Sequence, residues 1–132
     1  MKRKCELMIS NENGTRAIFI DTKNKQQLTD YLNSDEAIRK KFLHIAQIIL
    51  DNHRVPDLYD KEDINKKAKD VTAMKLFKGG ANTRIYCKEM MSETGMFIVV
   101  TAELLLKKKN QKNKSQEINL INKIAGYEYE IE

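Results

Sequence analysis

The chain has few of the residues on which several protein classes depend. Its 132 residues include two cysteines, two histidines and one proline. Cys5 and Cys87 are too few for the disulfide framework of a small secreted domain, so we expect reduced thiols in a cytoplasmic protein. The first ten residues hold no continuous apolar segment, which argues against a secretory signal. The longest apolar runs, 96–102 and 104–106, are too short to cross a membrane.

Motifs for cofactor and metal chemistry are missing as well. The sequence contains no P-loop, dinucleotide fingerprint, zinc knuckle or nucleophile elbow. His44 falls on the polar side of an expected helix and His53 at its end, without another histidine or cysteine at ligand spacing. We therefore predict no cofactor and no metal site. Neither cysteine has a histidine at a recognisable partnering position, so we assign neither a nucleophilic role.

Positive charge is what the chain has in excess. Lysine and arginine outnumber aspartate and glutamate by 24 to 19, for a net charge of +5. Residues 71–114 alone carry nine lysines and arginines against three glutamates. A basic region of this kind favours a polyanionic partner: nucleic acid, an acidic membrane or an acidic protein. With 41% hydrophobic and 33% charged residues, we expect a single folded domain over residues 1–132.

Local patterns in the first part of the chain predict two strands followed by helices. Residues 4–10 and 16–21 flank an Asn-Gly dipeptide, which is a strong signal for the turn of a β-hairpin. A short helix is expected over 25–33. Apolar residues spaced by three and four positions predict an amphipathic helix over about 35–52, whose apolar side should pack on a sheet.

The middle of the chain carries the remaining strands. Residues 51–70 hold the only proline and a mixed-charge run, which predicts a surface loop with at most one helical turn. Period-two alternation then predicts three strands, over 71–78, 83–88 and 96–106. Met90 and Met91 are expected in a turn between the last two strands. Ser115 begins an expected final helix over 115–125, and the alternating tail 127–132 returns as a strand or folds over the sheet.

These elements predict an α+β fold: an antiparallel sheet packed on one face by N-terminal helices, with a short C-terminal helix. The even-numbered residues of 96–106 are all small or apolar, so we expect them to face the 35–52 helix. The other face of the sheet would remain open and present Lys75, Arg84, Tyr86, Lys88, Thr101 and Glu103.

An open face of this composition has the chemistry to bind RNA and to cleave it without a metal. Lysine and arginine neutralise phosphates, and tyrosine stacks on bases. Cleavage needs a base for the 2′-hydroxyl, cations for the charge on the phosphate, and an acid for the leaving 5′-oxygen. Glu103 lies among the cations where it could act as the base, although an ion pair with Arg84 or Lys107 is the more common role. The alternative without a binding function is that the lysines form a solvated sheet edge, which improves solubility and discourages strand–strand association.

Three short motifs, in this order along the chain, resemble the RelE/HigB superfamily of toxins from bacterial toxin–antitoxin pairs. They are KLFKG at 75–79, RIY at 84–86 and KKKNQK at 107–112, and they follow a helix and precede a short amphipathic helix. Each motif is weak alone, and their order and spacing carry the resemblance, which covers roughly residues 35–130. The chain lacks the threonine usual in the last motif, and its N-terminal hairpin is longer than the single first strand of the family.

The resemblance implies a metal-independent mRNA endoribonuclease, in many members active on the ribosome, whose basic face is covered by a small antitoxin protein. It implies that Arg84 contacts the scissile phosphate and that Lys107 and Lys112 are the catalytic cations of the loop before the last helix. It also implies that a C-terminal tyrosine stacks on a base or helps proton transfer. The catalytic set is then Arg84, Lys107, Lys112, Glu103 and Tyr129. The RNA-binding set is Lys75, Lys78, Tyr86, Lys88, Lys108, Lys109 and Tyr127.

Two other functions stay open at this point. The same fold could lack nuclease activity and act as a nucleic-acid-binding or regulatory protein, or inhibit gyrase as the ParE branch of the superfamily does. Alternatively, the basic face could dock an acidic protein. In each case we expect no membrane partner.

Overall fold

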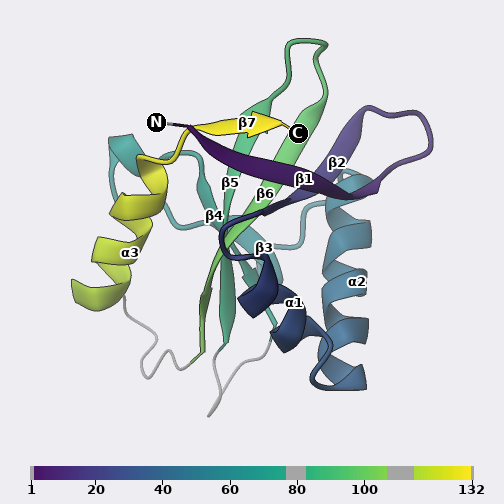
Figure 1. The fold of residues 1–132 in the computed structure, drawn as a ribbon, viewed down its shortest axis with the longest axis horizontal. Coiled ribbons are helices and arrows are strands. Elements are labelled where there is room, and N and C mark those ends of the chain that lie inside the picture. The colour runs from purple at the N-terminus through teal and green to yellow at the C-terminus, as the bar shows by residue number, and fades with distance from the viewer. Residues whose placement is uncertain (1, 77–82, 107–114, 132) are drawn as a thin grey trace.

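The computed structural model describes residues 2–76, 83–106 and 115–131. Within these residues the fold is α+β, with one mixed seven-stranded sheet in the order β3-β4-β5-β6-β2-β1-β7 (Figure 1). The elements in chain order are β1 (Arg3–Ser10), β2 (Arg16–Asp21), α1 (Lys25–Leu32), α2 (Glu36–Leu50), β3 (Tyr59–Lys61), the 3₁₀ turn η1 (Lys66–Ala68), β4 (Val71–Lys75), β5 (Arg84–Met91), β6 (Phe97–Leu105), α3 (Ser115–Ala125) and β7 (Tyr129–Ile131).

The predicted N-terminal hairpin is confirmed. Strands β1 and β2 pair antiparallel, with a register shift between Leu7 and Ile9. The turn places Gly14 at φ +69°, a left-handed conformation that glycine adopts without strain. The Asn11 side chain closes the turn by accepting hydrogen bonds from the backbone N–H groups of Thr15 (2.9 Å) and Arg16 (3.1 Å).

Both N-terminal helices are confirmed, close to the expected bounds. Helix α2 begins after Asp35, whose carboxylate accepts a hydrogen bond from the backbone N–H of Ala37 at 2.8 Å. Its apolar stripe packs against the sheet together with α1, and this first core is built from side chains of β2, β4, β5, β6 and both helices. Its members include Ile18, Leu28, Phe42, Ile45, Met74, Ile85 and Val99.

The sheet is mixed, which corrects the expectation of an antiparallel sheet packed on one face by N-terminal helices. Strands β3, β4, β5 and β6 form an antiparallel meander. The last strand of the meander, β6, lies beside β2 and runs in the same direction, so the two pair parallel. Strand β7 likewise pairs parallel with β1. The helices follow two strands of the sheet because the hairpin comes first in the chain.

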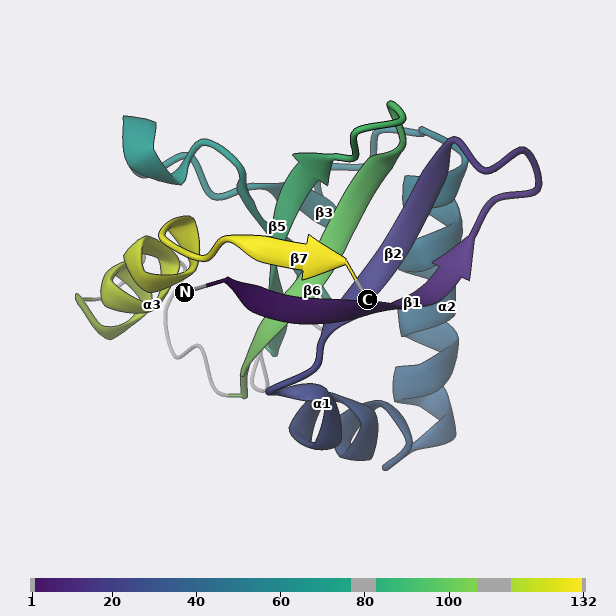
Figure 2. The ribbon, with the colours of Figure 1, turned by 45° about the horizontal axis from the view of Figure 1, so that its top comes forward.

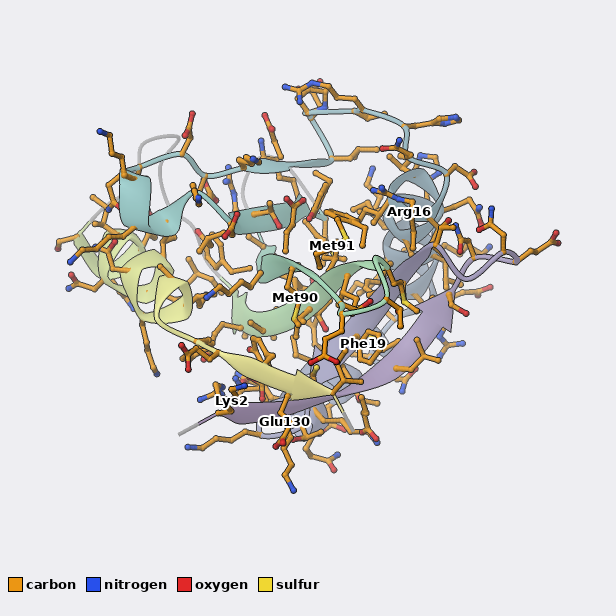
Figure 3. The ribbon with its side chains drawn as sticks, turned by 90° about the horizontal axis from the view of Figure 1, so that it is seen from above. Lys2, Arg16, Phe19, Met90, Met91 and Glu130 are labelled. Carbon is orange, nitrogen blue, oxygen red and sulfur yellow. The ribbon has the colours of Figure 1, made fainter. Side chains whose placement is uncertain are left out.

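The segment 51–70 contains more structure than a loop. It holds the one expected helical turn, η1, and also strand β3, which the sequence did not predict. Strand β3 is a three-residue Tyr-Asp-Lys segment on the sheet edge, too short and too polar to show alternation. Strand β5 also runs further than expected, through Met90 and Met91, and the turn begins at Ser92 (Figure 3).

The facing of β6 differs from the expectation. Ile98, Val100 and Ala102 lie on the face opposite α2, and Val99 points toward α2. A bulge then shifts the register, since Thr101 pairs with Cys87 but Glu103 pairs with Tyr86. Both faces of this strand are buried, so its apolar content did not reveal which face meets the helix.

The second face of the sheet is covered rather than open. Helix α3 and strand β7 lie across it and enclose a second core (Figure 2). That core joins Phe19, Tyr86 and Val100 of the sheet to Ile121 and Ile124 of α3. The expected open polar face is therefore corrected: α3 and the β1–β7 end of the curled sheet cover it. No helix within 2–76, 83–106 or 115–131 is long and apolar enough to cross a membrane.

Candidate functional site

Arg84 lies at the end of the sheet where three strands begin or stop. It is the first residue of β5 and pairs with Lys75, the last residue of β4, and with Leu105, the last residue of β6. The segments 77–82 and 107–114 connect to the chain at this same end. They carry the predicted site residues Lys78, Lys107, Lys108, Lys109 and Lys112, which lie outside the described residues. We call Lys75, Glu62 and Arg84 the sheet-end site.

The Arg84 guanidinium is held by a carboxylate that the sequence did not indicate. Its Nη1 donates to Oε1 of Glu62 at 2.8 Å, and the two side chains are 15% and 8% exposed. Glu62 follows β3, and its backbone N–H donates to the Val71 carbonyl at 3.1 Å. Because β3 was not predicted, the sequence offered no reason to bring Glu62, 22 residues away, beside Arg84.

Tyr86 is fully buried beside this ion pair. Among the described residues, its hydroxyl is the only buried side-chain nitrogen or oxygen without a hydrogen-bond partner. Burial, and then the negative charge of Glu62, raise the pKa of Tyr86; Arg84 opposes this shift, and Glu117 adds to it least. The hydroxyl is therefore a neutral phenol at neutral pH. Tyr86 shares the face predicted for it, but α3 separates it from solvent.

Lys88 anchors the end of α3. Its Nζ donates hydrogen bonds to the backbone carbonyls of Ala125, at 2.9 Å, and of Tyr127. A lysine at this position satisfies carbonyls that a helix end leaves without partners. Burial lowers the pKa of Lys88, and the charges of Asp70 and Glu128 oppose that shift. Lys75, by contrast, is half-buried and donates to the Pro56 carbonyl at 3.0 Å.

The C-terminal tyrosines belong to a separate group of ionisable side chains around Asp21. The Asp21 carboxylate is completely buried and accepts hydrogen bonds from Arg3 Nε at 2.7 Å and from the Tyr129 hydroxyl at 2.6 Å. It also accepts one from the Lys23 backbone N–H at 2.8 Å. Burial, and then the hydrogen bond to Asp21, raise the pKa of Tyr129 far above its ordinary value.

Tyr127 extends this group to β6. Its hydroxyl donates a hydrogen bond to the Glu103 carboxylate, and the Arg3 guanidinium lies 3.9 Å from the centre of its ring. The Tyr127 and Tyr129 rings meet edge to face, with centroids 6.0 Å apart. We call Arg3, Asp21, Glu103, Tyr127 and Tyr129 the C-terminal cluster. Glu103 thus has Tyr127 as its hydrogen-bond partner, whereas Arg84 pairs with Glu62.

The structure therefore divides the predicted site residues. It brings Lys75 and Arg84 together at the end of the sheet, next to the attachment points of the two lysine-bearing segments. It places Glu103, Tyr127 and Tyr129 in the C-terminal cluster, and Tyr86 and Lys88 beneath α3. Within the described ranges, no three histidine, cysteine, aspartate or glutamate side chains are grouped so that they could hold a metal ion.

A hollow of about 710 Å³ lies away from this region, between the β1–β2 turn and the C-terminal end of α2. Glu12, Asp51 and Arg16 contribute to its lining, together with several amide side chains. Two carboxylates against one guanidinium do not suit a phosphate ligand, so this hollow is no alternative to the sheet-end site. Comparisons of the chain with protein-family models, curated proteins and solved structures find no match.

Proposed function

We propose that the protein is a RelE-like toxin that cleaves mRNA in the cytoplasm without a metal ion, and that a small antitoxin protein inhibits it. The order of elements supports this proposal. The chain has α2, then β4, β5 and β6, and then α3, in the order that the three sequence motifs imply, with the short edge strand β3 and the turn η1 inserted between α2 and β4. The motif residues Lys75 and Arg84 are paired neighbours on adjacent strands.

The observation that carries the proposal is the position of Arg84. Glu62 engages Nη1 and is the side chain's one hydrogen-bond partner within the described ranges, which would leave Nη2 and Nε free to bind a second ligand. The planar guanidinium suits the paired oxygens of a phosphate. The segment 107–114 connects to the chain next to Arg84 and would supply Lys107 and Lys112 to the same phosphate.

The chemistry assigned to this site is an internal transesterification. The 2′-hydroxyl loses its proton to a base and attacks the phosphorus, and the bond to the 5′-oxygen breaks as that oxygen takes up a proton. The products are a 2′,3′-cyclic phosphate and a free 5′-hydroxyl. Arg84 would stabilise the extra negative charge, and the lysines would assist charge and proton transfer. Glu103 and Tyr129 would take part only after leaving their partners in the C-terminal cluster.

Growth and mRNA integrity under tightly controlled expression test the proposal. Wild type should arrest a bacterial host within minutes and degrade its mRNA, and Arg84→Gln should do neither. Arg39→Gln, an exposed position on α2, is the matched control and should behave as wild type. Normal growth with wild type, or unchanged arrest with Arg84→Gln, would contradict the proposal.

The Arg84 variant needs a check on folding, because the substitution leaves the buried Glu62 carboxylate without its cation. The double variant Glu62→Gln/Arg84→Gln restores charge balance and should fold as stably as wild type. If the double variant is folded and still inactive, the loss of activity belongs to the arginine itself.

One observation favours a second candidate function, a nucleic-acid-binding protein of the same fold that does not cleave. Glu62 offsets the charge of Arg84, and α3 with β7 covers the face that would otherwise carry Tyr86 and Glu103. Salt-sensitive binding of RNA or DNA with no cleavage products would support this candidate.

A further inference from the structure

The buried hydroxyl of Tyr86 is a group that the proposed reaction does not use. Tyr86 is completely buried, and among the described residues its hydroxyl is the one buried side-chain nitrogen or oxygen without a hydrogen-bond partner. Buried polar groups are nearly always hydrogen-bonded, because leaving one without a partner is unfavourable. The hydroxyl is therefore a donor that a second arrangement of the neighbouring side chains could use.

Glu62 is the acceptor best placed for that second arrangement. After burial itself, the negative charge of Glu62 is the largest cause of the raised pKa of Tyr86, although no hydrogen bond joins the two side chains. Arg84 and Tyr86 are alternate residues of β5, so their side chains leave the same face of the strand. The Glu62 carboxylate thus contacts one of them and acts electrostatically on the other. Rotation about the side-chain bonds of Glu62 is the movement that would carry it between them.

A phosphate at Arg84 would have to share the guanidinium with the Glu62 carboxylate. Glu62 Oε1 accepts a hydrogen bond from Arg84 Nη1 at 2.8 Å, and the two side chains are only 8% and 15% exposed. Two anions on one guanidinium repel each other, and low exposure to water strengthens that repulsion. Phosphate binding is therefore favoured when the carboxylate leaves the guanidinium for an uncharged donor.

We propose that Glu62 changes partner when a phosphate binds: its carboxylate leaves Arg84 and accepts a hydrogen bond from the Tyr86 hydroxyl, while the phosphate takes its place on the guanidinium. The proposal rests on the proposed function, which supplies an RNA phosphate as the ligand. This partner exchange leaves all three side chains paired, whereas the hydroxyl has no partner in the structure. Glu62 and Tyr86 are then positioning residues, since both act on RNA through Arg84. The hydroxyl keeps its proton, and no covalent bond forms or breaks.

Binding of a fluorescent 2′-O-methyl RNA oligonucleotide tests the partner exchange without depending on catalysis, because this RNA has the phosphates but no free 2′-hydroxyl. Fluorescence anisotropy at pH 7 compares wild type with Tyr86→Phe, Glu62→Gln and the double variant Tyr86→Phe/Glu62→Gln. Tyr31→Phe is the matched control, since it removes a hydroxyl from α1 on the other face of the sheet. Urea denaturation without RNA gives the stability of each variant.

The two single variants should change RNA affinity in opposite directions. Tyr86→Phe should weaken binding by about 10-fold or more, because the displaced carboxylate loses a hydrogen bond to a charged acceptor. Glu62→Gln should strengthen binding by about 10-fold, because a neutral amide does not repel the phosphate. Once Glu62 is replaced, the further change Tyr86→Phe should alter affinity by less than about 3-fold, because the two side chains act as a unit.

The stability of Tyr86→Phe separates the partner exchange from a purely structural role of the tyrosine. The substitution removes a hydroxyl that has no partner, so the free energy of unfolding without RNA should not fall. Loss of affinity without loss of stability, from a side chain buried beneath α3, is expected only if the hydroxyl acts when RNA binds.

Four outcomes overturn the partner exchange. Unchanged affinity in Tyr86→Phe, or an equal loss in Tyr31→Phe, would do so even if wild type arrests growth through Arg84. Weaker RNA binding by Glu62→Gln would show that the carboxylate holds the guanidinium in place for the phosphate. An undiminished effect of Tyr86→Phe in the Glu62→Gln background would assign the hydroxyl to another acceptor.

The same measurements distinguish the partner exchange from the proposed function. Absence of RNA binding by wild type would overturn both. The expected pattern of affinities in a protein that leaves mRNA intact would support the partner exchange and overturn the nuclease activity alone.

Discussion

The two faces of the sheet are buried by different chemistry. The face under α1 and α2 is packed by aliphatic and aromatic side chains, such as Phe42, Ile45 and Ile85. The face under α3 and β7 also has an apolar core, but it adds the C-terminal cluster, the Lys88 anchor and the Glu62–Arg84 ion pair. The first face has one comparable group, in which the Tyr59 hydroxyl bonds to Glu89 and Thr72. Ionisable side chains are therefore more numerous on the side where the C-terminal segment closes over the sheet.

The difference indicates what positions each layer. Apolar burial stabilises α1 and α2 in proportion to area and is not directional. The C-terminal segment is instead tied to particular atoms, since Tyr129 reaches Asp21 and Lys88 reaches the carbonyls at the end of α3. Replacing buried ion pairs by apolar groups is often neutral or stabilising, so these contacts are better explained as setting position than as the main source of stability. Three variants test this contrast.

The largest loss of stability is expected from the apolar face. Ile45 is completely buried on α2, and Ile45→Ala should lower the free energy of unfolding by about 2–5 kcal/mol because it leaves a cavity. Leu43, on the same helix, is 49% exposed, and Leu43→Ala should cost less than about 1 kcal/mol. Urea denaturation at pH 7 measures both. Similar losses in the two variants would show that α2 is held by something other than its buried stripe.

A smaller loss is expected from the ionisable face. Asp21→Asn keeps the size of the side chain but removes the charge that Arg3 and Tyr129 contact, and should cost about 1.5–3 kcal/mol. The β7 amides should lose more protection against hydrogen exchange than the drop in global stability explains. The α2 amides should lose only as much protection as that drop explains. Glu93→Gln, in the exposed β5–β6 turn, is the control and should change neither. Equal loss of protection in β7 and α2 would contradict a specific anchoring role.

The smallest effect is a difference in pH dependence. The folded state raises the pKa of Tyr129 above its ordinary value of 10.0, so above pH 10 the unfolded chain loses this proton first. The free energy of unfolding of wild type should therefore fall more steeply with pH than that of Tyr129→Phe, by up to about 1.4 kcal/mol per pH unit. Ile45→Ala retains the tyrosine and should keep the wild-type slope. Denaturation curves between pH 9.5 and 11.5 measure the slopes, and parallel curves for Tyr129→Phe and wild type would contradict the assignment.

Much of the local structure was readable from the sequence. The Asn-Gly turn, the three- and four-residue spacing in 35–52 and the alternation in 71–75 and 84–88 each reflect contacts within one element or between neighbours. For the same reason the sequence correctly placed Lys75, Arg84, Tyr86 and Lys88 on one face, since alternation and antiparallel pairing decide facing.

The candidate site was less accessible to such reasoning. Local pattern says which face a residue occupies, but not what covers that face. Tyr86 and Lys88 were therefore expected in solvent and lie beneath α3. Glu62 went unnoticed because its partner, Arg84, is brought near only by a short polar edge strand.

The sequence by itself determined the positions of the main helices and strands and the face on which most of the central side chains lie, because periodicity and turn chemistry act over a few residues. Tertiary structure alone decided that β2 meets β6 in parallel, that α3 and β7 close the second face, and that Asp21 receives Tyr129 from 108 residues away. Such contacts depend on the path of the whole chain. Their energies come from burial and hydrogen bonding between segments whose separate sequences carry no sign of one another.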